Sequence, residues 1–355
     1  MESKQSANFS TKSGAIITIV KTCALTIVGA LLGRLLPIPM GEMFGALTVV
    51  FIASKLGHRM QLPPHNLTFI QIILGISVGN LVDGAQWQNG FSIGIVFGLF
   101  VCMAIQTAVG YFWLRRREGW SRDESLLGAV PGAMAAVIVM TDSQQMPAKK
   151  VIFTHTVRLV SLMILAAALA SFGETSPAAV DAYEPNSAPM VISVLGIGLV
   201  VVVSLLLGRL LEQFNVPAPY MLTGMLISAV TALNFPEYSF ALPDMCLMLA
   251  MALLGALVAV RVQFVTLAET CSYLRAGMII LALGLGVTFV VTGLFSWWLE
   301  IEWLVLIMAW VPGSIEAMTV TALLLGLEPT FVMLNHIIRL TILHALPALI
   351  LYRSR

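Results

Sequence analysis

Apolar positions fill most of this chain in long runs, and short polar stretches separate the runs. A helix that crosses about 30 Å of hydrocarbon needs roughly 20 residues at about 1.5 Å per residue, and runs of this length recur from residue 14 onward. The pattern predicts an all-α polytopic membrane protein. Its expected segments are 14–36, 40–56, 67–83, 90–114, 124–141 and 151–173, followed by 189–211, 219–235, 240–260, 275–299, 303–325 and 330–352.

The composition agrees with that pattern, because 59% of the 355 residues are hydrophobic and only 10% are charged. A soluble domain of this size needs more charge to cover its surface. Residues 1–13 are polar and are expected to form a cytoplasmic segment. The first apolar run has no credible cleavage site, so we interpret it as a membrane helix and not as a removable signal peptide.

The twelve segments form two similar sets of six. "GRLL" occurs at 33 and at 208, "PMGEMFGAL" at 39 resembles "PAPYMLTGML" at 217, and "VPGAMAAV" at 130 resembles "VPGSIEAM" at 311. "HTVR" at 155 and "HIIR" at 336 lie 181 positions apart, as do the two Val-Pro-Gly sequences. The chain is therefore expected to hold a duplicated domain. Repeat 1 would span 14–173, an acidic periplasmic linker 174–188, repeat 2 residues 189–352, and a cytoplasmic tail 353–355.

The charges between segments favour an inverted arrangement of the two repeats. If 124–141 and 303–325 each enter and leave on one side, the basic loops fall on one side and the acidic loops on the other, as the positive-inside rule requires. Each repeat would then have about five transmembrane helices plus one re-entrant or broken Pro-Gly segment, with both termini in the cytoplasm. The short segments 40–56 and 219–235, which Pro-x-Pro precedes, are the alternative non-spanning elements.

Two Pro-Gly pairs interrupt apolar segments at matching positions. Proline lacks an amide hydrogen and breaks a helix, and irregular backbone at membrane depth persists only where protein shields it or where it lines a wet cavity. Paired interruptions in two inverted halves indicate the binding site of a transporter. We therefore expect Pro131 and Gly132, together with Pro312 and Gly313, to contribute to such a site.

Each Pro-Gly pair precedes a His-x-x-Arg motif, which places the two side chains on one helix face. Arg158 lies close enough to Lys150 to extend toward the cytoplasm, whereas Arg339 begins from the outer side and needs a partner, water or an anion. We predict that both arginines bind substrate. His155 and His336 titrate near neutral pH when exposed and are candidates for proton movement, although a structural role is the simpler reading of each.

Other polar residues near these motifs complete the predicted site. Glu316 is expected to act as the counter-ion of Arg339 or as a proton carrier, or else to contact water at the outer interface. Ser314, Asn335 and Thr154 add short hydrogen-bonding groups.

Several function classes lack support in the sequence. The cysteines and the remaining histidines show no metal-ligand spacing, and there is no phosphate-binding loop, nucleotide fingerprint or nucleophile elbow. No loop is long and basic enough to bind nucleic acid. We expect no enzyme activity, no cofactor and no metal.

The motifs that begin at Pro39, Val130 and Val311, with the downstream His-x-x-Arg, resemble those of the bacterial AbrB-type inner-membrane family. This sequence departs from the family pattern at Ala133 and Ser314, where a second glycine is usual, and at Ala135, which lacks the acidic group of Glu316. The resemblance implies a duplicated membrane domain. Members have been labelled membrane regulators of gene expression and also an ammonia monooxygenase, but the sequence shows no copper or iron ligand cluster.

The leading hypothesis is a secondary transporter of a small organic anion, proton-coupled and working by alternating access between inverted repeats. The alternative is a membrane-embedded regulator or sensor that acts through a partner protein. The expected partners are the anion, protons and the lipid bilayer of the bacterial inner membrane. A homo-oligomer is left open, and so are the substrate, the coupling ion and the direction of transport.

Overall fold

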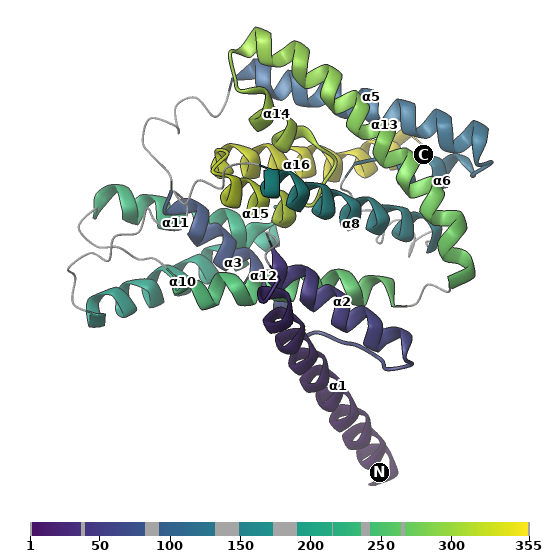
Figure 1. Ribbon diagram of the computed structural model, residues 1–355. Helices are drawn as coiled ribbons and strands as arrows, with labels where there is room; N and C mark the ends of the chain where they lie inside the picture. Colours follow the sequence, from purple (N-terminus) through teal and green to yellow (C-terminus); the bar gives the residue numbers. More distant parts are fainter. Residues whose placement is uncertain are drawn as a thin grey trace. The chain divides into compact units, whose positions relative to one another are not determined.

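A computed structural model describes residues 2–36, 40–81, 92–131, 149–172, 190–214, 216–235, 242–263 and 267–353. Within these ranges the chain forms thirteen helices and no strand (Figure 1). The helices are α1 Glu2–Arg34, α2 Gly41–Lys55, α3 Asn66–Gly79, α5 Ile93–Arg117, α6 Arg122–Ala129, α8 Lys149–Phe172, α10 Met190–Gln213, α11 Pro219–Asn234, α12 Asp244–Val262, α13 Leu267–Leu299, α14 Trp303–Trp310, α15 Ile315–Leu325 and α16 Pro329–Arg353.

The helices follow the predicted segments closely, with three informative differences. α1 begins at Glu2, so the helix extends back through residues that were expected to form a separate polar segment. α13 begins at Leu267, eight positions before the predicted start. The segment 303–325 divides into two short helices around Pro312, and of the corresponding segment 124–141 only α6 and the two residues after it are described.

Close glycine contacts hold together one compact part of the chain, which contains residues 1–73 and 242–264. Gly29 and Gly33 of α1 face Gly41 and Gly45 of α2, and a Cβ atom at any of the four would overlap backbone atoms of the opposite helix. α12 also packs against α2, where a Cβ at Gly255 would overlap the Met43 carbonyl. Small residues permit such close approach where hydrophobic contact alone does not drive helix association.

The second compact part contains the remaining residues and includes a similar contact between α11 and the end of α3. Gly75 and Gly79 lie against Met221 and Met225, so a Cβ at either glycine would overlap the α11 backbone. The hydroxyl of Ser228 also donates to the Ile76 carbonyl at 3.1 Å. α11 is therefore fixed to α3 by both packing and a hydrogen bond.

α5 and α13 run antiparallel within this second part. Gly94, at the start of α5, lies beside Leu299 at the end of α13, whereas Gly110 lies beside Ile280. α6 follows the end of α5, and α14 follows the end of α13. Because the two long helices are antiparallel, α6 and α14 begin near opposite ends of the pair.

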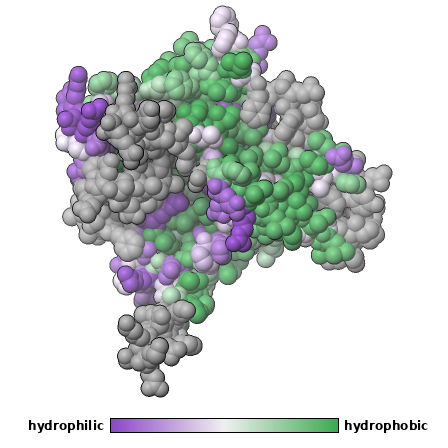
Figure 2. All heavy atoms as spheres, turned by 180° about the vertical axis from the view of Figure 1, so that it is seen from behind, coloured by the Kyte–Doolittle hydropathy of each residue, from purple (hydrophilic) through white to green (hydrophobic). Residues whose placement is uncertain are grey.

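Hydrophobic side chains cover much of the outer surface, as the extended green areas of Figure 2 show. On α10, for example, Leu195, Leu199 and Leu206 are each about two-thirds exposed. Apolar surface of this extent is unfavourable in water and suits contact with lipid. Five of the described helices are long and apolar enough to cross a membrane, and the qualifying stretches are Ala15–Arg34, Ile93–Arg117, Val194–Gln213, Asp244–Arg261 and Tyr273–Leu299.

Candidate functional site

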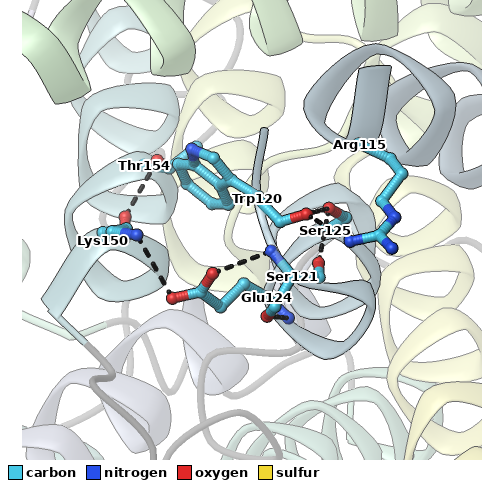
Figure 3. A network of polar contacts seen from close by, with 7 residues as sticks. All are labelled: Arg115, Trp120, Ser121, Glu124, Ser125, Lys150 and Thr154. Carbon is cyan, nitrogen blue, oxygen red and sulfur yellow. Dashed lines mark hydrogen bonds and ion pairs between the residues drawn. The ribbon is translucent and has the colours of Figure 1, made fainter. Parts of the chain in front are cut away.

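A hydrogen-bonded capping box fixes the entrance of α6 (Figure 3). The Ser121 side chain accepts from the Glu124 amide at 3.2 Å, and the Glu124 carboxylate accepts from the Ser121 amide at 3.0 Å. Arg115, at the end of α5, donates to the Trp120 carbonyl at 2.9 Å. The first two contacts satisfy amides that a helix start leaves without partners, and the Arg115 contact joins the end of α5 to the residue before the cap.

The same carboxylate links α6 to α8. Lys150 forms an ion pair with Glu124 at 3.4 Å, and its ammonium group lies over the Trp120 ring. Burial alone would raise the pKa of the Glu124 carboxyl. The hydrogen bonds from Ser121 and the charge of Lys150 outweigh that effect and hold the pKa below its usual range. The junction lies beside the basic last turn of α5, at the end of a candidate span.

Both short helices end at a proline that removes a hydrogen bond. Val130 directly follows α6 and Val311 directly follows α14, and both valines have extended backbones. In a continuous helix the next residue would donate its amide to the carbonyl four positions earlier, but Pro131 and Pro312 have no amide hydrogen. The two carbonyls that lose this donor belong to Leu127 and Met308.

The histidines of the His-x-x-Arg motifs supply the missing donors. The His155 Nε2 atom lies 2.9 Å from the Leu127 carbonyl oxygen, and the His336 Nε2 atom lies 3.1 Å from the Met308 carbonyl oxygen. A carbonyl oxygen only accepts, so Nε2 carries the proton in both rings. Each histidine therefore replaces the backbone hydrogen bond that the proline upstream cannot form.

The arginines bind carbonyls directly at the break. Arg158 Nη2 donates to the Val130 carbonyl at 3.4 Å and lies 2.7 Å from Nδ1 of His155. Since a guanidinium group cannot accept, His155 Nδ1 is the acceptor and this imidazole is neutral. Arg339 donates from Nη1 to Val311 and from Nη2 to Gly313, both at 2.6 Å.

These contacts repeat between the two halves of the chain. Each histidine and its carbonyl are 28 positions apart, and so are each arginine and the extended valine. α6 at 122–129 and α14 at 303–310 also differ by the 181 positions that separate the motifs. The duplicated domain predicted from the sequence is thus confirmed in its local hydrogen bonding.

The two guanidinium groups bring positive charge into the interior. Arg158 is 3% exposed and Arg339 is 1% exposed. They lie close enough to interact electrostatically, and neither forms an ion pair with a carboxylate among the described residues. Buried charge is costly unless it is paired or hydrogen-bonded, and among the described residues these two groups contact backbone carbonyls and His155.

Sequence analysis missed a polar network beside the second break. Gln106 of α5 donates from Nε2 to Thr288 Oγ1 at 2.7 Å and reaches the Trp310 carbonyl at 3.4 Å. The indole of Trp310 donates to Asn335 Oδ1 at 3.2 Å. A glutamine within a long apolar run was the available signal, because a buried amide at such depth needs partners.

The remaining predicted residues occupy different environments. Thr154 donates to the Lys150 carbonyl of its own helix, and Ser314 caps α15 by accepting from the Ala317 amide. Glu316 is half-buried in the first turn of α15, where the positive end of the helix dipole favours a carboxylate. Its role as counter-ion or proton carrier stays a prediction. Gly132 lies outside the described residues.

The fold defines a duplicated helical membrane protein in which two short helices end at matching prolines beside two buried arginines. The family described as "Transition state regulatory protein AbrB" matches the chain over residues 1–94 and again over 43–354. The chain belongs to this AbrB family, which confirms the resemblance seen in its motifs. No characterised protein in the curated set matches the chain.

Proposed function

We propose that this protein is a secondary transporter of a small organic anion in the bacterial inner membrane. The observation that carries the proposal is the pair of buried, mutually repelling arginines beside two helix breaks. An anion bound between them would offset the cost of burying both charges. Interrupted helices at matching positions of a duplicated membrane domain are a frequent construction for such sites.

The depth of the centre supports the proposal. Gln106, which contacts the Trp310 carbonyl, lies nine residues before Arg115 and fourteen after Ser92. At about 1.5 Å per residue these separations correspond to about 13 Å and about 21 Å along α5. The broken end of α14 is therefore adjacent to the middle of a helix long enough to span the bilayer.

Inverted repeats and alternating access form part of the same proposal. The antiparallel α5 and α13, with α6 and α14 starting near opposite ends, support an inversion of the corresponding elements. Basic residues at the end of α5 and acidic residues around the start of α14 support cytoplasmic and periplasmic ends respectively. Access would alternate as one set of elements moves relative to the other.

Proton coupling would fall mainly to His336. Nδ1 of His155 already accepts from Arg158, so a proton there would disrupt that contact. His336 has its Nδ1 atom buried and without a hydrogen-bond partner among the described residues. Of the two histidines proposed from the sequence, His336 is the one whose second nitrogen remains available to take a proton.

Transport can be tested with the purified full-length chain in proteoliposomes. Uptake of radiolabelled mono-, di- and tricarboxylates should be saturable, and both Arg158→Gln and Arg339→Gln should reduce it by at least tenfold. Substitution of the exposed Arg209 by glutamine is the matched control and should leave uptake unchanged. Failure of wild-type protein to move or bind any organic anion would reject the proposal.

The inversion has a separate test. Single cysteines at Gly119, after α5, and at Glu300, after α13, would be introduced into a variant in which the native cysteines are serines. In intact cells a membrane-impermeant maleimide should label position 300 only. Labelling of both positions from outside would contradict the inverted arrangement.

The second candidate is a membrane-embedded regulator that acts through a partner protein, and the description of the family favours it. A regulator would bind a ligand without carrying it across the bilayer. Ligand binding without flux in proteoliposomes, together with a reproducible partner in cross-linking experiments, would support this alternative over transport.

A further inference from the structure

The two helix breaks differ in their unsatisfied polar atoms. Three buried side-chain atoms near the second break lack hydrogen-bond partners among the described residues: Gln106 Oε1, His336 Nδ1 and Arg339 Nε. The three side chains are 5%, 0% and 1% exposed, respectively. Buried polar atoms nearly always have hydrogen-bond partners, so three unpaired atoms near one break indicate that a bound molecule supplies the partners.

These atoms gather around one turn of the chain. The partnered atoms of the same three side chains contact the carbonyls of Met308, Trp310, Val311 and Gly313, which lie within six consecutive residues. Cys102, which contacts Gln106, also lies close enough to Arg339 for an electrostatic interaction. At the first break, in contrast, Arg158 occupies Nδ1 of His155.

The partnered atoms determine what each unpaired atom requires. His336 uses its Nε2 proton on Met308, so its Nδ1 atom accepts when the ring is neutral. The Thr288 hydroxyl donates its proton to the Gly284 carbonyl, so it can only accept from Gln106. The Gln106 atom near Thr288 is therefore the donor Nε2, and the unpaired atom of this side chain is the acceptor Oε1. Arg339 Nε can only donate. A ligand that fits this group therefore presents an acceptor to the arginine and a donor to one of the other two atoms.

We propose, on the basis of the transport function above, that the second break binds the hydroxyl-bearing end of a hydroxycarboxylate. The carboxylate accepts from Arg339 and reduces the positive charge, and the hydroxyl donates to Gln106 Oε1. A water molecule would satisfy the hydrogen bonds but would leave the charge uncompensated. The ammonium group of an amino acid would supply donors but would be repelled by the two arginines.

Matched pairs of acids test this assignment on the purified full-length protein by isothermal titration calorimetry. Malate and succinate, and likewise lactate and propionate, differ by one hydroxyl at equal charge. We expect the hydroxylated member of the pair that fits the site to bind at least about tenfold more tightly, because loss of the hydroxyl leaves a buried acceptor unpaired. Aspartate should bind more weakly than malate.

Gln106→Leu should bring the affinity ratio of the pair that fits the site towards one, because the variant has no acceptor for the hydroxyl. The same substitution at Gln71, another buried glutamine, should preserve the ratio. If Gln106→Leu does not fold, the wild-type ratio decides alone. Equal binding of the two members in both pairs means that the three atoms hold water only, which overturns this inference but leaves anion transport standing. Binding of no acid overturns both proposals.

Discussion

Replacing His336 with leucine tests whether the motif compensates for the proline break. The change removes the donor to the Met308 carbonyl, and Pro312 has no amide hydrogen to replace it. Histidine and leucine side chains have similar volumes, so the change leaves little empty space. The dominant effect is therefore a buried carbonyl without a partner, and we expect the free energy of unfolding to fall by about 1–3 kcal/mol. Equilibrium unfolding in mixed micelles, followed by tryptophan fluorescence, measures the difference.

His58→Leu is the matched control, because His58 is exposed and the same substitution there should change stability by less than about 0.5 kcal/mol. Pro312→Ala supplies a second check, since it restores an amide at the break. Pro312→Ala should destabilise the His336→Leu variant less than it destabilises the wild-type protein. The interaction free energy between the two substitutions should be about 0.5–3 kcal/mol. Equal stability of His336→Leu and His58→Leu would refute the compensation argument.

Further predictions concern packing and the polar junctions. Gly33→Leu should sharply reduce the yield of folded protein in size-exclusion chromatography because its Cβ would overlap a carbonyl of α2, whereas Gly198→Leu, with open space around it, should be tolerated. Asn335→Leu removes the acceptor of the Trp310 indole and should lower the unfolding free energy by about 1–3 kcal/mol in the same micelle assay. The pKa of Glu124 is lower in the folded protein than its ordinary value, so the ionised carboxylate stabilises the fold above the ordinary carboxyl pKa. This contribution is lost as the pH falls through the pKa of the folded state. The Glu124→Gln variant should therefore be less stable than the wild-type protein at pH 7, and its free energy of unfolding should depend less on pH between pH 3 and 5. Parallel pH profiles of the two proteins would contradict this.

Much of the architecture was predictable because the membrane imposes a simple length rule. Runs of about 20 apolar residues mark crossing helices irrespective of their neighbours, so most predicted segments lie within a few residues of the observed helices. Repetition of Val-Pro-Gly and His-x-x-Arg at one offset likewise revealed the duplication. The start of α1 was missed because its first polar turns give no hydrophobic signal.

The candidate site was only partly visible in the sequence. A proline within an apolar segment indicates that one backbone amide donor is missing, and a following His-x-x-Arg motif places two polar side chains on one helix face. Sequence spacing alone did not reveal that each histidine contacts the carbonyl that the proline leaves without a donor, because the histidine and that carbonyl are 28 residues apart. Gln106 was overlooked for the same reason, because its partners Thr288 and Trp310 lie far away in the sequence.

The sequence by itself determined that this is a duplicated helical membrane protein with two matched breaks, since hydropathy and proline chemistry act locally. The tertiary structure decided how the breaks are satisfied and where the halves differ. His155 is engaged on both nitrogens, while His336 and Arg339 retain unpaired atoms around α14. That difference depends on the orientation of a few side chains within packed helices, which no local pattern of residues specifies.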